Sequence, residues 1–166
     1  MEIIDCWCSP SAVSVIDTIN FSSDDLIQSI RLPKTGSSAH QVLFDPTNQF
    51  LLVPDLKADL IRIYKVDERL RLNEMTSLVM SPGTGPRHAT WWSPDPVKVP
   101  NGGPLFLIVN GELSGMVSVY RVTYNGSKES LSFTLVSQAN SLDQDISVKK
   151  YTTAEIAVSV SNLERR

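Results

Sequence analysis

The stretches Ala39-His40-Gln41-Val42-Leu43-Phe44-Asp45-Pro46 and Arg87-His88-Ala89-Thr90-Trp91-Trp92-Ser93-Pro94 are built alike. Each has a histidine, an apolar run and a proline six places after the histidine, and the two histidines are 48 residues apart. Self-similarity at a period of roughly 20 to 50 residues is the sequence pattern of propellers and solenoids. This repeat therefore predicts the fold before any single motif does.

An apolar run and then an alternating run that ends in tyrosine follow each stretch. The first unit has Phe50–Val53 and Leu60–Tyr64, and the second has Leu105–Val109 and Met116–Tyr120. Short alternating runs bounded by turn residues are typical of strands. Because the chain has almost no helix pattern, we expect an all-β fold.

Each unit is predicted to hold four strands, as the blade of a β-propeller does. The second unit also carries an insertion rich in Pro and Gly at Asp95–Gly103, which we expect in a surface loop. The predicted strands are Gln41–Phe44, Phe50–Asp55, Leu60–Val66 and Glu74–Met80 in the first unit, and Ala89–Trp92, Leu105–Asn110, Met116–Val122 and Leu131–Val136 in the second.

Partial units are predicted on either side of the two complete ones. Val13–Asp17 resembles the third run of the repeat, and Leu26–Leu32 is predicted as a fourth strand, although Ser22–Asp25 before it could start a helix. Thr153–Ser159 has the pattern of a first strand. Residues 1–11 have no clear pattern, and the polar stretch 140–150 is expected to be irregular.

The prediction is a β-propeller fragment with about three consecutive four-stranded blades, two of them complete and two partial. It forms a single partial domain: residues 12–33 end one blade, 39–80 and 87–137 are complete blades, and 153–166 start the next. A propeller needs about four to eight blades to close its ring. We therefore expect a piece of a propeller whose open strand edges allow self-association.

The composition is that of an ordinary globular domain. The chain has 166 residues, 42% hydrophobic and 20% charged, and a net charge of −3, with no basic cluster that would indicate nucleic-acid binding. The apolar runs are too short to span a membrane. Met1–Asp5 is acidic where a signal peptide would be basic, so a cytoplasmic location is expected.

Cys6 and Cys8 are the two cysteines. Alternate residues of a strand share a face, so this pair could bind a metal. Without a second pair of ligands, small buried apolar residues are the favoured interpretation, and a disulfide is not expected in a reducing compartment. The sequence predicts neither a metal site nor a cofactor.

Five polar residues are predicted to meet at one end of the propeller, near its axis. In a blade, the loop before the first strand and the loop after the second lie on the same end. This arrangement places His40, Arg87 and His88 beside Asp55 and Glu112. A guanidinium, an imidazole and a carboxylate around a concave mouth can hold an anionic ligand and move protons.

Each of these residues also has a purely structural interpretation. His88 could bond to the backbone of a neighbouring blade, and Arg87 could form a surface ion pair. Glu112 could be a solvated turn residue, and Asp55 could cap a turn. Of Trp91 and Trp92, one is expected to face the core and the other a neighbouring sheet.

The chain resembles the seven-bladed propeller lactonases, a family that includes bacterial 6-phosphogluconolactonase and the fungal carboxy-muconate lactonising enzyme. The resemblance covers roughly residues 12–160 and is carried by His40–Thr47, Leu52–Tyr64, Gly85–His88, Gly111–Tyr120 and Ala154–Ser159.

The resemblance implies a metal-independent enzyme that acts on lactones. It implies catalytic roles for His40, Arg87 and Glu112: Arg87 would hold a carboxylate or phosphate, and the other two would exchange the proton. His88 and Asp55 are candidate substrate-binding residues. A further arginine of the family has no clear counterpart here.

The expected function is a lactone hydrolase, or a lactonising cycloisomerase, acting on a small anionic sugar-acid or muconate-type lactone. The same three groups serve both reactions, so the sequence does not choose between them. The alternatives are a non-catalytic propeller that binds a partner or ligand, and an inactive fragment.

Overall fold

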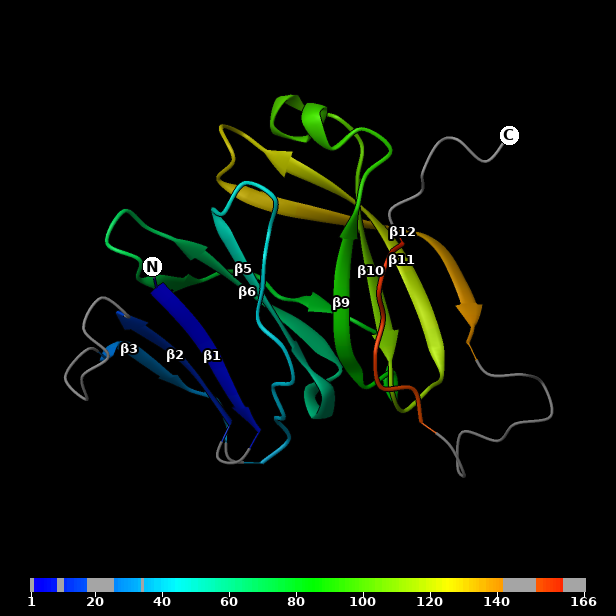
Figure 1. The fold of residues 1–166 in the computed structure, drawn as a ribbon. Coiled ribbons are helices and arrows are strands. Elements are labelled where there is room, and N and C mark those ends of the chain that lie inside the picture. Colours follow the sequence, from blue (N-terminus) through cyan, green and yellow to red (C-terminus); the bar gives the residue numbers. More distant parts are fainter. Residues whose placement is uncertain (1, 9–10, 18–25, 34, 142–151, 160–166) are drawn as a thin grey trace.

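The computed structural model describes residues 2–8, 11–17, 26–33, 35–141 and 152–159. In these ranges the strands pair antiparallel, and two short 3-10 helices lie between them. The strands form three sheets that lie side by side in chain order (Figure 1). The all-β fold of consecutive propeller blades is therefore confirmed.

The first sheet is a three-stranded meander in the order β1-β2-β3. The strands predicted at Val13–Asp17 and Leu26–Leu32 are confirmed, whereas the possible helix start at Ser22–Asp25 lies outside the described residues. The first strand was not predicted because apolar and polar residues do not alternate in it. The strands are β1 Glu2–Cys8, β2 Ser11–Asp17 and β3 Leu26–Arg31.

The second sheet is the first complete blade, and its two central strands begin and end where the sequence predicts. The predicted fourth strand is split into two pieces that both pair with β6, where Tyr64 lies opposite Glu74 and Ile61 opposite Leu78. The outer chain thus has one more residue than β6 over this span, which is a β-bulge. The elements are β4 Leu43–Phe44, β5 Phe50–Asp55, η1 Leu56–Ala58, β6 Leu60–Val66, β7 Leu72–Glu74 and β8 Leu78–Val79.

The inner strand β4 is shorter than predicted. Continuing the register of Leu43 with Leu52 would place Gln41 opposite Pro54. Proline has no N–H to donate, so the ladder is interrupted there. Pairing resumes at an isolated bridge between Ala39 and Asp55.

The third sheet is the second complete blade, in the order β12-β11-β10-β9. Each of its strands extends beyond the predicted bounds. The β11–β12 pairing continues from Asn125 opposite Ser130 to Met116 opposite Asn140, and the β9–β10 pairing continues to Pro86 opposite Gly111. The insertion at Asp95–Gly103 folds as a 3-10 helix. The elements are β9 Pro86–Trp92, η2 Pro96–Asn101, β10 Leu105–Gly111, β11 Met116–Asn125 and β12 Ser130–Asn140.

Two apolar cores join the three sheets, and β5 contributes to both. Leu51 and Val53 pack toward the first sheet, while Phe50 and Leu52 pack toward the third. β5 is buried throughout because both of its faces are covered. A strand covered on both faces needs apolar residues at successive positions, which explains the unbroken apolar run Phe50–Val53.

Three polar contacts between the second and third sheets fix how the two blades meet. The Gln41 side chain accepts a bond from the Ala89 N–H at 2.7 Å, and the Trp91 indole donates to the Phe44 carbonyl at 2.8 Å. The Tyr124 hydroxyl donates to the Asp45 carboxylate at 2.6 Å. Trp91 thus faces the neighbouring blade, while Trp92 is 41% exposed and stacks beside Phe106. The expectation that one tryptophan faces a neighbouring sheet holds for Trp91, and the expectation that the other faces the core is wrong for Trp92.

Residues 152–159 run alongside β9 and β10 (Figure 1, orange-red) but are not assigned to a strand. The first-strand pattern at Thr153–Ser159 therefore does not produce a strand in the described part of the chain. No helix within the described ranges is long and apolar enough to cross a membrane.

Candidate functional site at the inner ends of two blades

Backbone contacts hold the loop before β9 against the turn after β10. The Glu112 N–H donates to the Gly85 carbonyl at 2.8 Å, and the Ser114 N–H donates to the Thr84 carbonyl at 3.3 Å. A Cβ on Gly111 would lie 2.8 Å from the Thr84 carbonyl oxygen, so this close approach requires glycine. The residues that follow Gly85 and Gly111 are thereby brought together.

Arg87 occupies the extra position of a β-bulge. Asn110 pairs with His88 and Gly111 pairs with Pro86, so Arg87 has no partner of its own on β10. A bulge turns a side chain away from the regular alternation, and bulges are common beside active sites. The sequence predicted Arg87 and His88 in the loop before the strand, and this placement is wrong, because both residues belong to β9.

The guanidinium of Arg87 forms an ion pair with the carboxylate of Glu112, with 2.5 Å between Nη1 and Oε2. The two side chains are 29% and 17% exposed, so both reach the surface. The buried Nε of Arg87 has no hydrogen-bond partner among the described residues. Because a guanidinium has five N–H donors, this pair leaves Arg87 able to bind an anion as well.

His40 shares this cluster from the preceding blade. Burial lowers the pKa of the His40 imidazole below its ordinary value, and the positive charge of Arg87 lowers it further. Glu112 and Asp55 act in the opposite direction, and His88 adds to the lowering. His40 is therefore neutral at pH 7 and able to accept a proton.

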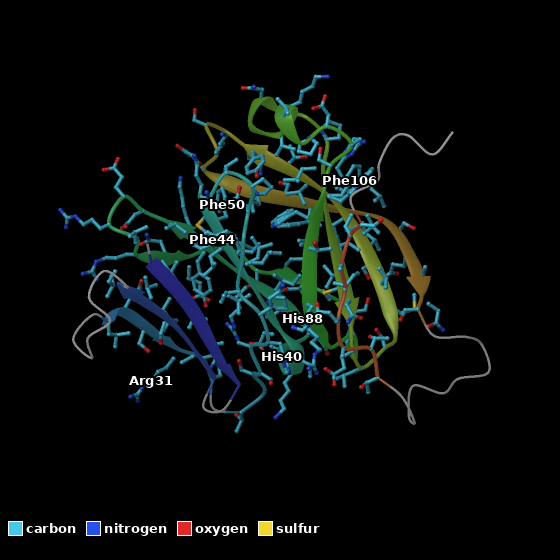
Figure 2. All side chains as sticks on the ribbon, viewed as in Figure 1. Arg31, His40, Phe44, Phe50, His88 and Phe106 are labelled. Carbon is cyan, nitrogen blue, oxygen red and sulfur yellow. The ribbon has the colours of Figure 1, made fainter. Side chains whose placement is uncertain are left out.

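His40 and His88 lie at the same end of the blades (Figure 2), and the two rings interact electrostatically. The structure thus brings together His40, Arg87, His88 and Glu112, as the blade geometry predicts. The alternative for His88 is also observed, because its Nδ1 lies 2.7 Å from the carbonyl oxygen of Ala154.

Asp55 does not take part in the way expected of a substrate-binding residue. Its side chain has no exposed surface, and its carboxylate accepts bonds from the Ser37 hydroxyl at 2.5 Å and the Ser38 N–H at 2.6 Å. Arg62 completes the shell with a 2.9 Å ion pair. Asp55 therefore caps and supports the loop before His40, which was its structural interpretation.

Asp59 was not singled out from the sequence, although it positions the site. Its carboxylate accepts the N–H groups of Gly83 and Gly85, each at 2.7 Å. This contact fixes the loop that leads into Arg87. The Gly-rich stretch Gly83-Thr84-Gly85 indicates a loop, but nothing in the sequence identifies Asp59 as its partner.

The described residues contain no group of three or more His, Cys, Asp or Glu side chains that could hold a metal ion. The side chains of Cys6 and Cys8 are outside the described part, so the interpretation of that pair remains a prediction.

Comparison with known proteins identifies the family. The family described as "Lactonase, 7-bladed beta-propeller" matches residues 25–163, which is most of the chain. The protein therefore belongs to this family of propeller lactonases.

Two curated relatives are both named for the same activity. The "Probable 6-phosphogluconolactonase" of Arthroderma benhamiae is 44% identical over 85 residues, covering 51% of this chain and 20% of the relative. The "6-phosphogluconolactonase" of Serratia proteamaculans is 35% identical over 101 residues, covering 60% of this chain and 28% of the relative. The chain thus matches 20% to 28% of the length of these relatives.

Solved structures agree on the fold. A protein from Lactobacillus plantarum has a TM-score of 0.66 at 23% identity, covering 88% of this chain and 41% of that one. A periplasmic gluconolactonase of Pseudomonas aeruginosa has a TM-score of 0.62 at 21% identity, covering 88% and 40%. At these identities the likeness concerns the fold alone.

Proposed function

We propose that the protein hydrolyses an anionic sugar-acid lactone of the 6-phosphogluconolactone type. The observation that carries this proposal is the meeting of a neutral histidine, an arginine and a glutamate from two blades. The names of the relatives support hydrolysis of a phosphorylated lactone, and neither relative is named as a cycloisomerase. The cytoplasmic location remains a prediction from the sequence.

The proposed reaction uses the side chains of this cluster. Arg87 binds the phosphate or carboxylate of the lactone, for which a guanidinium is well suited. His40 accepts the proton of the water that attacks the lactone carbonyl, because its lowered pKa leaves it neutral. Glu112 orients Arg87 and passes the proton from His40 to the ring oxygen. The bond between the carbonyl carbon and the ring oxygen breaks at this step, so the ring oxygen leaves as a hydroxyl group.

Preference for a charged lactone tests the role of Arg87. We expect hydrolysis of 6-phosphogluconolactone to be favoured over that of glucono-δ-lactone, and this preference to disappear in Arg87→Met. The exposed Arg121, which lies over the Phe106 ring, supplies the control Arg121→Met. Equal rates on both lactones, or a preference that survives Arg87→Met, would contradict the proposal.

A further inference from the structure

The His88 ring makes a second set of contacts that the proposed reaction does not use. Its Nδ1 lies 2.7 Å from the carbonyl oxygen of Ala154 and 3.2 Å from a carboxylate oxygen of Glu155. A carbonyl oxygen only accepts hydrogen bonds, and an ionised carboxylate likewise only accepts. Nδ1 must therefore carry the hydrogen and donate it.

The position of this hydrogen determines what the other ring nitrogen can do. A neutral imidazole has one N–H and one lone pair, so a hydrogen on Nδ1 leaves the lone pair on Nε2. Histidine side chains in water favour the opposite tautomer, with the hydrogen on Nε2. The contacts of His88 thus reverse the ordinary preference.

The backbone segment that makes these contacts is anchored on the same part of the sheet. The Thr153 hydroxyl lies 2.6 Å from the Asn110 side-chain oxygen and 3.2 Å from the Gly111 carbonyl. Asn110 is buried and lies opposite His88 in the β9–β10 register. Thr153 therefore places the next two residues, Ala154 and Glu155, over His88.

His88 lies at the same end of the blades as His40 (Figure 2) and directly follows Arg87 in β9. Burial and Arg87 are the larger causes of the lowered pKa of His40, and His88 contributes to it, in agreement with the position of the two histidines in Figure 2. The charged and titratable groups near His88 are Glu155, 3.2 Å from Nδ1, Arg87, which precedes it in β9, and His40, with which it interacts electrostatically.

We propose that Ala154 and Glu155 hold His88 as a hydrogen-bond acceptor, through Nε2, for a hydroxyl group of the lactone. Arg87 would bind the anionic group, and His88 would select a ligand that also carries hydroxyls. This inference rests on the proposed function and assigns a residue to the recognition of the sugar hydroxyls. Muconate-type lactones, which carry carboxylates without hydroxyls, would not make this contact. Glu155 is then a positioning residue, since it acts through His88.

The tautomer is measured directly by NMR on the 166-residue chain labelled with ¹⁵N-histidine. The chain has two histidines, so the variant His40→Gln identifies the signals of His88. In mildly alkaline buffer, where imidazole is neutral, we expect long-range ¹H–¹⁵N correlations to show a protonated Nδ1 and an unprotonated Nε2. A His88 ring protonated on Nε2 would overturn the proposal.

Two variants distinguish a specific effect of Glu155 on the His88 tautomer from the general effect of removing a negative charge. Glu155→Ala should reduce the population of the Nδ1–H tautomer, because the Ala154 carbonyl alone then holds it. The exposed Glu68 provides the control Glu68→Ala, which should leave the ring unchanged. An unchanged tautomer in Glu155→Ala would overturn the role assigned to Glu155.

The role in ligand selection is tested with two anions on the same labelled chain. The product 6-phosphogluconate should shift the His88 Nε2 signal, whereas adipate, a dianion without hydroxyls, should not. A response to both, or to neither, would overturn the selection proposed here. These NMR experiments do not require the chain to hydrolyse a lactone. A failure of the proposed hydrolysis would therefore appear in the rate measurements and not in the tautomer of His88.

Discussion

The Arg87 guanidinium and the Glu112 carboxylate meet at 2.5 Å although 25 positions separate them in the sequence. The first lies at a β-bulge and the second follows a strand end that is pinned by backbone contacts. The pairing of β9 with β10 does not by itself place these two residues opposite each other. The ion pair therefore depends on the loop around Gly85 and the turn around Gly111. Substitutions in this loop or turn should consequently change the activity of the site.

Asp59 should support activity without touching a substrate. In Asp59→Ala, the Gly83 and Gly85 N–H groups lose their acceptor, and we expect a loss of about 1–3 kcal/mol in the free energy of unfolding. Turnover of 6-phosphogluconolactone should also fall, because Arg87 loses its fixed position. Urea denaturation and initial rates measure the two effects.

The control for Asp59 is Asp67→Ala. Asp67 also accepts backbone N–H groups, from Arg69 and Arg71, but in an exposed turn. This variant should leave turnover unchanged. Equal losses of turnover in the two variants would contradict a specific role for Asp59.

The hydroxyls of Tyr124 and Tyr64 should differ in their contribution to stability. Tyr124 donates to the buried Asp45 carboxylate, so Tyr124→Phe should cost about 1–2 kcal/mol. The buried Tyr64 hydroxyl has no hydrogen-bond partner among the described residues, so Tyr64→Phe should be neutral or stabilising. Thermal and urea unfolding compare the variants, and a larger loss in Tyr64→Phe would contradict this assignment.

The lowered pKa of His40 should make stability depend on pH in a defined direction. Burial is the main cause of the lowering, so the folded state binds this proton less tightly than the unfolded state. The contribution of neutral His40 to the free energy of unfolding is fully present above the pKa of the unfolded state, about 6.5. It is lost as the pH falls through the lower pKa of the folded state. His40→Gln should remove this part of the dependence, as measured by unfolding at several pH values. An unchanged pH dependence in that variant would show that His40 is not the group involved.

Self-association of the chain remains a prediction, and substitutions on the exposed strand β12 can test it. Val136 is 49% exposed on this strand, and the strand lies at the edge of its sheet. We expect the chain to associate in sedimentation experiments and Val136→Lys to weaken the association, because charges protect strand edges. Val97→Lys, at a valine that is 84% exposed in η2, serves as the control. A chain that stays monomeric at high concentration would contradict the prediction.

The parts predicted well from the sequence are those with regular local signals. β5 and β6 have turn residues at both ends, and the repeat itself predicts that His40, Arg87 and Glu112 share one end of the blades. β1 was missed because its residues do not alternate, and the bulge that divides β7 from β8 depends on pairing with β6.

The supporting residues of the site depend on partners far along the chain. Asp59 contacts amides 24 and 26 positions away, and Asp55 is occupied by Ser37 and Ser38 from 18 and 17 positions before it. A carboxylate in a turn looks the same in the sequence whether it binds a ligand or the backbone of its own protein. Three-dimensional packing alone separates the two.

The most direct test of the proposed function is the rate of 6-phosphogluconolactone hydrolysis by the chain, its His40→Ala variant and its Glu112→Gln variant. Proton transfer by a positioned side chain contributes about 100-fold or more to a rate, so each variant should fall by at least that factor while remaining folded. Rates in both variants equal to that of the unmodified chain would contradict the assignment of this cluster as the catalytic site.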